Sequence, residues 1–160
     1  MKHPKHYDTD AVTSKRMSSV KLKRGRVETM LAKELWHRGY RYRLNYNKLP
    51  GSPDIALKKY NIAIFIDGEF WHGKDWDIRK ESLKRNKEYW KEKIEENIAR
   101  DNRIDIELRQ LGWIALHYWS KQVLDSVEYC ADEIEGIIAE IIKEKTNQYL
   151  NNDIFEEISN

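Results

Sequence analysis

The apolar run Ile62–Ile66 most strongly constrains how this chain folds. It lies between a Tyr-Asn turn at 60–61 and the acidic segment Asp67-Gly68-Glu69. An uninterrupted apolar run of this kind is typical of a strand that is buried on both faces. The sequence therefore predicts a central strand that carries carboxylates at its C-terminal end.

The rest of the chain predicts helices on either side of a short sheet. Val27, Met30, Leu31 and Leu35 recur at helical spacing, and Gly39 ends that helix. Strands are predicted at 40–46, 54–58 and 113–119, with a turn at 50–53. A long helix is predicted from Leu83 to Leu111. The last helix is predicted to turn four residues inward, namely Ile134, Ile137, Ile138 and Ile141. The fold class is therefore mixed α/β, with a short central mixed sheet flanked by helices.

The chain has 160 residues, which favours one domain over residues 1–160. Residues 1–20 are expected to form a basic arm or a loose helix, and residues 146–160 to fray. Cys130 is the single cysteine, so neither an internal disulfide nor a multi-cysteine zinc site is expected. The absence of a long apolar run predicts no membrane span and, by default, a cytoplasmic location.

Charge is distributed unevenly along the chain. Residues 1–43 hold 12 Lys and Arg against 4 Asp and Glu, whereas residues 122–160 hold 2 Lys against 10 Asp and Glu. A basic segment of this kind is typical of a polyanion-binding face. The alternative is that the two ends attract each other within the fold.

Two short segments, PGSPDIAL at 50–57 and AIFIDGEFWHG at 63–73, hold most of the chemical information. They place Asp54, Asp67 and Glu69 at neighbouring strand ends, where carboxylate oxygens could hold Mg²⁺. A bound magnesium polarises a phosphoryl group and activates water, as phosphodiester hydrolysis requires. His72 follows closely and is a candidate acid or base.

These segments resemble the PD-(D/E)xK nucleases, although Glu69 stands where lysine is usual. The wider pattern resembles the very short patch repair (Vsr) endonucleases, bacterial nickases of T·G mismatches. The matching segments also include TSKRM (13–17), RVETMLAKEL (26–35), EYWKEKIEENIARDNRID (88–105) and LGWIALHYW (111–119). The resemblance implies a restriction-endonuclease-like three-layer sandwich and a magnesium-dependent DNA endonuclease.

The resemblance also implies roles for individual residues. The implied catalytic residues are Asp54, Asp67, His72, Glu28, Asp101 and Glu69. The implied magnesium ligands are Asp54 and the backbone carbonyl of Ile66, and the acidic side chains of Asp67 and Glu69 are further candidates. The implied DNA contacts are Met17, Phe70, Trp71, Trp90 and Lys93, together with the basic Lys15 and Arg16. Phe70, Trp71 and Trp90 would insert beside the mismatched bases.

Two departures from the family pattern affect these expectations. The family has a histidine where this chain has Asp67, so we expect Asp67 to bind metal instead. The family's zinc-ligand positions fall at or near Glu69, Gly73 and Lys121, so we expect no structural zinc. The loop from Gly73 to Arg85 must then be held by packing, for which Trp76 and Ile78 are candidates, or be mobile.

Two other functions stay open at this point. One is a restriction-type or other PD-(D/E)xK nuclease that does not recognise mismatches. The other is a catalytically weak DNA-binding module, which the carboxylates oppose because they repel phosphate. The expected partner is double-stranded DNA, with mismatch-repair proteins as further candidates and a monomer as the expected state.

Overall fold

The computed structural model describes residues 25–69, 71–82 and 86–158. Its sheet has four strands in the order β1-β2-β3-β4. They are β1 (Arg43–Leu44), β2 (Ile55–Leu57), β3 (Ile62–Asp67) and β4 (Ile114–Trp119). The pairs β1–β2 and β2–β3 are antiparallel, and the pair β3–β4 is parallel. The predicted mixed sheet is therefore confirmed.

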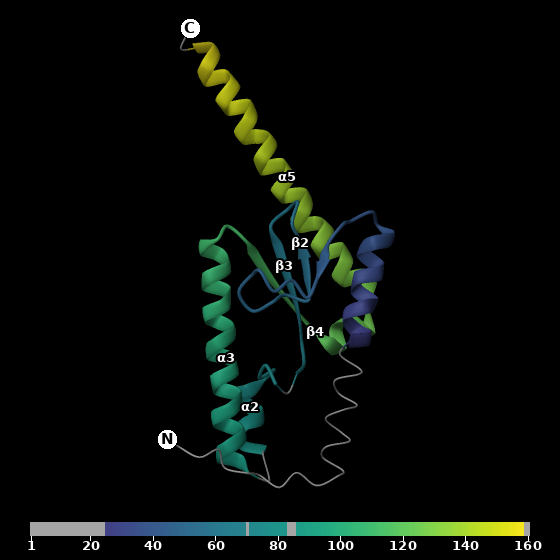
Figure 1. Ribbon diagram of the computed structural model, residues 1–160, viewed down its shortest axis with the longest axis vertical. Coiled ribbons are helices and arrows are strands. Elements are labelled where there is room, and N and C mark those ends of the chain that lie inside the picture. Colours follow the sequence, from purple (N-terminus) through teal and green to yellow (C-terminus); the bar gives the residue numbers. More distant parts are fainter. Residues whose placement is uncertain (1–24, 70, 83–85, 159–160) are drawn as a thin grey trace.

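Helices cover both faces of this sheet (Figure 1). The helix at residues 25–37 and α5 (Val127–Ile158) lie on one side, and α3 (Lys87–Gln110) lies on the other. Three short helical segments complete the described chain: α2 (Trp76–Arg79), η1 (Lys80–Ser82) and α4 (Ser120–Asp125). The arrangement is consistent with the predicted three-layer sandwich.

The alternation of side chains along β3 divides the core into two layers. Ile62, Ile64 and Ile66 belong to the larger layer, which packs against the helix at 25–37 and α5. Ala63 and Phe65 belong to the smaller layer beneath α3. All six residues of β3 are buried, as predicted for a central strand. Asp67 continues the second series, so its carboxylate faces the α3 side.

Some predicted boundaries were wrong. The strand expected at 40–46 is only Arg43–Leu44, because left-handed Asn45 begins a turn in which the Leu49 N–H donates to the Tyr46 carbonyl. The long helix expected from about Leu83 is described from Lys87, and residues 83–85 lie outside the described residues. The last helix extends to Ile158, so it includes most of residues 146–160, which were expected to fray. In that helix Ile134 and Ile138 are buried, and Ile137 and Ile141 pack against the same core, as predicted.

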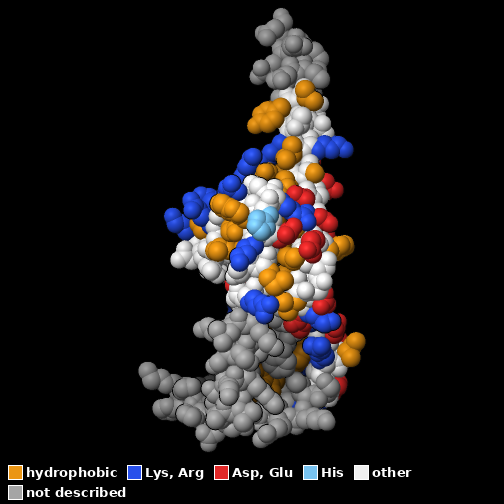
Figure 2. Space-filling model, turned by 90° about the vertical axis from the view of Figure 1, so that its right-hand side faces the viewer, with side chains coloured by type: hydrophobic (Ala, Val, Ile, Leu, Met, Phe, Trp, Pro, Cys, Tyr) orange, Lys and Arg blue, Asp and Glu red, His pale blue; other side chains and the backbone are white. Residues whose placement is uncertain are grey.

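Arg38 joins the helix at 25–37 to the acidic α5. Its guanidinium donates to Glu34, Asp132 and Glu135 at 2.6–2.7 Å. Figure 2 shows basic and acidic side chains lying next to one another on this side of the molecule. Part of the positive charge of residues 1–43 is therefore paired within the fold. None of the described helices is long and apolar enough to cross a membrane.

Candidate active site

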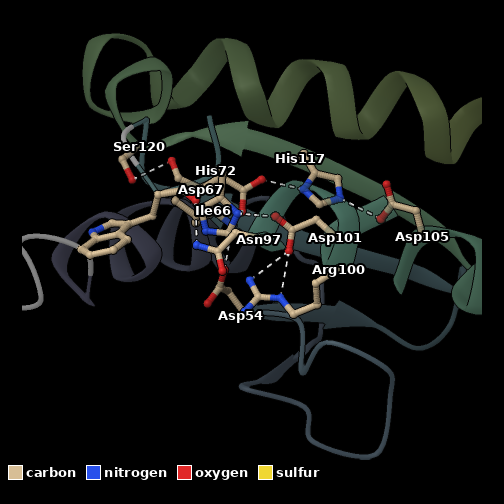
Figure 3. Close-up of polar contacts among 11 residues, drawn as sticks. Asp54, Ile66, Asp67, His72, Asn97, Arg100, Asp101, Asp105, His117 and Ser120 are labelled. Carbon is tan, nitrogen blue, oxygen red and sulfur yellow. Dashed lines mark hydrogen bonds and ion pairs between the residues drawn. The ribbon is translucent and has the colours of Figure 1, made fainter. Parts of the chain in front are cut away.

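A pocket of about 370 Å³ lies where the C-terminal end of β3 meets α3. Its walls combine two acidic strand ends, two histidines and one face of a helix. The residues that line it are Gly51, Ser52, Asp54, Phe65, Asp67, His72, Arg100, Asp101, Ile104 and His117. Four residues predicted to be catalytic, Asp54, Asp67, His72 and Asp101, therefore meet in one place (Figure 3).

The periodicity of strands and helices explains why these side chains lie in one pocket. Asp67 lies two residues after Phe65 on β3, so both side chains face α3. His117 on β4 is the register neighbour of Phe65, and the two rings stack with centroids 4.9 Å apart. On α3, Asp101 and Asp105 are four residues apart and share the helix face above the sheet.

Asp54 stands just before β2 and is tied to β3. Its Oδ2 accepts a hydrogen bond from the backbone N–H of Ile66 at 2.7 Å. The backbone of Asp54 is also fixed, because its carbonyl accepts from the Asn45 N–H at 3.0 Å. The two segments singled out in the sequence are thus joined directly at the pocket wall.

Asp67 is the buried charged residue of the described core, with only 5% of its surface exposed. Its Oδ2 lies 2.6 Å from Nδ1 of His117, and its Oδ1 lies 3.4 Å from Nδ1 of His72. His72 is held more closely by Asp101, whose Oδ2 lies 2.7 Å from the same Nδ1. A carboxylate acceptor at Nδ1 favours a proton on that nitrogen, which leaves Nε2 of His72 as the atom available for chemistry.

His117 carries a carboxylate on each ring nitrogen. In addition to Asp67 at Nδ1, Oδ1 of Asp105 lies 2.9 Å from Nε2. Burial by itself lowers the pKa of His117, but the hydrogen bonds to Asp67 and Asp105 outweigh it and raise the pKa to about 9. His117 is therefore an imidazolium at neutral pH.

We expect His117 to titrate near pH 9 in the folded protein, well above the ordinary histidine value of about 6.5. Because the folded pKa is raised, the stabilisation is fully present below about pH 6.5 and is lost as the pH rises through about 9. Proton NMR of the ring in EDTA measures the midpoint. A His117 midpoint at or below the ordinary histidine value of about 6.5 would contradict the described contacts.

The segment after β3 carries the aromatic residues. Trp71 and Trp90 form an edge-to-face pair with centroids 5.5 Å apart, and both are half-buried. The side-chain amide of Asn97 on α3 donates to the Trp71 carbonyl at 3.0 Å. Farther along, the Trp76 indole donates to Glu95 at 3.4 Å, but Ile78 is 80% exposed. Ile78 therefore does not pack this loop, contrary to the expectation.

Gly73 follows His72 and tightens this segment against α3. It has a φ of +68°, and a Cβ placed there would lie 2.5 Å from Cδ1 of Ile98. Alanine at this position would be strained by its backbone and would also collide with the end of the half-buried Ile98 side chain.

We expect Gly73→Ala to lower the melting temperature and to disturb the contact between His72 and Asp101, because His72 must move with the displaced backbone. Gly112→Ala is the matched control: Gly112 has a φ of +75°, but a Cβ there has no atom within 4 Å. Backbone strain alone costs about 1–2 kcal/mol, and overpacking adds about 1–3 kcal/mol. Equal melting temperatures for the two variants would refute the close contact with Ile98.

The other predicted site residues lie elsewhere or outside the described residues. Glu28 on the helix at 25–37 does not line this pocket. Glu69 does not line it either, and its Oε1 accepts from the Lys121 N–H at 2.7 Å. Lys93 is exposed on α3, and its Nζ lies 3.6 Å from Oε2 of Glu96. Four predicted DNA contacts lie outside the described residues: Lys15, Arg16, Met17 and Phe70.

Three residues of the site were not anticipated from the sequence: Arg100 and His117, which line the pocket, and Asp105, which contacts His117. Arg100 donates to Oδ1 of Asp101 at 3.0 Å and so supports the carboxylate that holds His72. A signal for His117 was present, because alternation along 113–119 puts it on the same side as Trp113 and Ala115. Nothing in the sequence indicated that this side would face Asp67.

The sequence also matches known proteins. A profile of the family described as DNA mismatch endonuclease Vsr matches residues 6–78. The type II nicking enzyme V.HpaIIP of Haemophilus parainfluenzae is 49% identical over 123 residues, which cover 77% of this chain and 87% of the relative. The chain belongs to the Vsr family of DNA endonucleases.

Other Vsr-family relatives support the same assignment. The type II nicking enzyme V.NmeDIP of Neisseria meningitidis serogroup C is 44% identical over 122 residues, or 76% of this chain and 82% of the relative. The DNA mismatch endonuclease Vsr of Escherichia coli strain K12 is 36% identical over 109 residues, or 68% of this chain and 69% of the relative.

Nucleases of this family use a divalent metal, and the pocket offers suitable ligands. Asp54 and Asp67 both line it with hard carboxylate oxygens. Among the described residues no three His, Cys, Asp or Glu side chains gather closely enough to hold a metal alone. Magnesium does not need such a cluster, because it keeps several waters and is often bound through one or two carboxylates. The two carboxylates of the pocket are therefore sufficient ligands for a divalent metal that keeps part of its water shell.

Proposed function

We propose that this Vsr-family endonuclease requires magnesium and nicks duplex DNA at T·G mismatches. The observation that carries the proposal is the meeting of Asp54, Asp67, His72 and Asp101 in one pocket. The relatives named as nicking enzymes and as a DNA mismatch endonuclease support the single-strand cut and the mismatch.

In this proposal Asp54 and the carbonyl of Ile66 hold the magnesium, and Asp67 adds a second carboxylate. Bound magnesium would polarise the scissile phosphate and lower the pKa of a bound water. His72, oriented by Asp101 at Nδ1, uses Nε2 to exchange a proton with a reacting oxygen. Glu28 and Glu69 stay proposed contributors that would act from outside the described pocket.

Recognition of the mismatch is assigned to the aromatic residues. Trp71 and Trp90 present an apolar pair next to the pocket, and Phe70 is the third proposed member. Apolar side chains inserted between bases unstack and kink a duplex, which costs less energy at a mismatched pair. Lys15, Arg16, Met17 and Lys93 are the proposed backbone and groove contacts. No structural zinc is proposed, because the single cysteine cannot form the family's site.

The deciding experiment compares nicking of two duplexes that differ only by a T·G pair in place of a T·A pair. We expect one strand of the T·G duplex to be cut with Mg²⁺, and no cutting in EDTA. A circular plasmid assay separates nicking from double-strand cleavage. Equal cutting of the matched duplex would favour the restriction-type alternative. Binding without cutting under every metal condition would favour a DNA-binding module.

A further inference from the structure

His117 is the most tightly held side chain at the pocket that the proposed chemistry does not use. Its ring is fixed by Asp67 at 2.6 Å, by Asp105 at 2.9 Å, and by stacking on Phe65 with an interplanar angle of 13°. These contacts link β3, β4 and α3 in one row of polar groups (Figure 3). The row continues through Asp67 toward His72.

The two hydrogen bonds define what His117 can do. A carboxylate accepts at each ring nitrogen, so both nitrogens act as donors. Neither nitrogen is left to exchange a proton with a substrate in this arrangement. The ring is therefore expected to orient the carboxylates that it contacts, and not to react with the phosphate.

Asp67 is the group most affected by His117. Its contact with His117 at 2.6 Å is much shorter than its approach to His72 at 3.4 Å. The backbone of Asp67 is fixed separately, because the Ser120 hydroxyl donates to its carbonyl at 3.2 Å. The remaining freedom of this buried residue is rotation of the carboxylate, which the His117 hydrogen bond restricts.

We propose that His117 and Asp105 are positioning residues that fix the Asp67 carboxylate toward the pocket. The proposal rests on the proposed function insofar as Asp67 is there a magnesium ligand. A carboxylate has about four acceptor positions, so Asp67 can accept from His117 and still bind a cation. Hydrogen-bond partners of metal ligands typically contribute about 10–100-fold in affinity or activity.

The sequence places the two members of this pair on neighbouring strands. The family pattern has a histidine at the position that Asp67 occupies in this chain, whereas here the imidazole comes from His117 on the next strand. The two side chains lie on the same sheet face and directly touch. Asp105, one helical turn after Asp101, supplies the outer carboxylate of the row.

Two amide variants of His117 test the direction of the effect. The Nδ2 of His117→Asn takes the place of the ring Nδ1 and can still donate to Asp67. The Nε2 of His117→Gln takes the place of the ring Nε2 and can reach only Asp105. Positioning of Asp67 therefore predicts that asparagine functions better than glutamine, an order that general loss of packing does not produce.

The variants are compared by nicking at a series of Mg²⁺ concentrations, and by Mn²⁺ binding to the DNA-free protein using electron paramagnetic resonance. We expect His117→Gln and His117→Ala to lose about 10–100-fold in nicking. Both should need more Mg²⁺ for half-maximal rate and should bind Mn²⁺ more weakly. His117→Asn should retain more of each property, and Asp105→Ala should fall between. His37→Asn, at an exposed histidine, is the matched control.

Melting temperatures show whether each variant is folded at the assay temperature. The proposal is overturned if asparagine and glutamine behave alike, or if all folded variants match the wild type in nicking and Mn²⁺ binding. Failure of the proposed function gives a different result, in which the wild type itself does not nick with Mg²⁺. Mn²⁺ binding still ranks the variants in that case.

Discussion

Asp54→Asn is expected to abolish nicking while leaving the protein folded and able to bind DNA. Asparagine keeps an oxygen that can accept the Ile66 N–H now held at 2.7 Å, so the junction of β2 and β3 survives. It loses the negative charge that a magnesium ion requires. We expect a loss of at least about 10²–10³-fold, the scale seen when one group that stabilises transition-state charge is removed.

The measurement pairs the nicking rate with DNA affinity in Ca²⁺ and with the melting temperature. Asp77→Asn is the matched control, because that side chain is 93% exposed and lies outside the pocket. An Asp54→Asn protein that nicks at close to the wild-type rate would move the catalytic centre away from this pocket. A loss of nicking together with a loss of folding would make Asp54 a structural residue only.

Asp67→Asn is expected to cause the second large loss, about 100-fold or more in nicking. It should also reduce stability, which separates it from Asp54→Asn. The amide nitrogen that replaces one oxygen cannot accept from His117 or His72, so one buried donor loses its partner. An unsatisfied buried donor costs about 1–3 kcal/mol.

Urea unfolding and a Mg²⁺ titration of nicking measure the two effects. A higher Mg²⁺ requirement is the result expected for a metal ligand. Nearly full activity with an unchanged Mg²⁺ requirement would instead reduce Asp67 to a turn-forming residue, since asparagine also suits an Asp-Gly turn. Unchanged stability would contradict the burial of this carboxylate between two histidines.

Periodicity in the sequence was sufficient to predict most of the fold. The central strand, the helix ended by Gly39 and the inward isoleucines of α5 follow from local patterns of apolar residues. The strand at 40–46 was overestimated because the alternation continues into Asn45 and Tyr46, whose backbone N–H groups donate to the carbonyls of Asp54 and Pro53 beyond the end of the strand. Its end depends on the left-handed Asn45 and on turn hydrogen bonds, which alternation does not encode.

Some residues of the candidate site could likewise be predicted from the sequence, and others could not. Asp54 and Asp67 were predictable because a strand end fixes where their carboxylates point. His72 and Asp101 were identified by resemblance, and the structure places them 2.7 Å apart. His117 and Asp105 were missed because their meaning depends on how β4 and α3 dock against β3. Such docking is set by packing between segments far apart in the chain.

The continuity of α3 gives the enzyme a fixed internal spacing. Trp90, proposed to contact the mismatch, and Asp101, which holds His72, belong to the same unbroken helix. At about 1.5 Å per residue they are separated by about 16 Å along its axis. One inserted residue between them would rotate one relative to the other by about 100°. Insertions and deletions in this stretch would therefore uncouple the choice of base pair from the choice of phosphodiester, even if every site residue were retained.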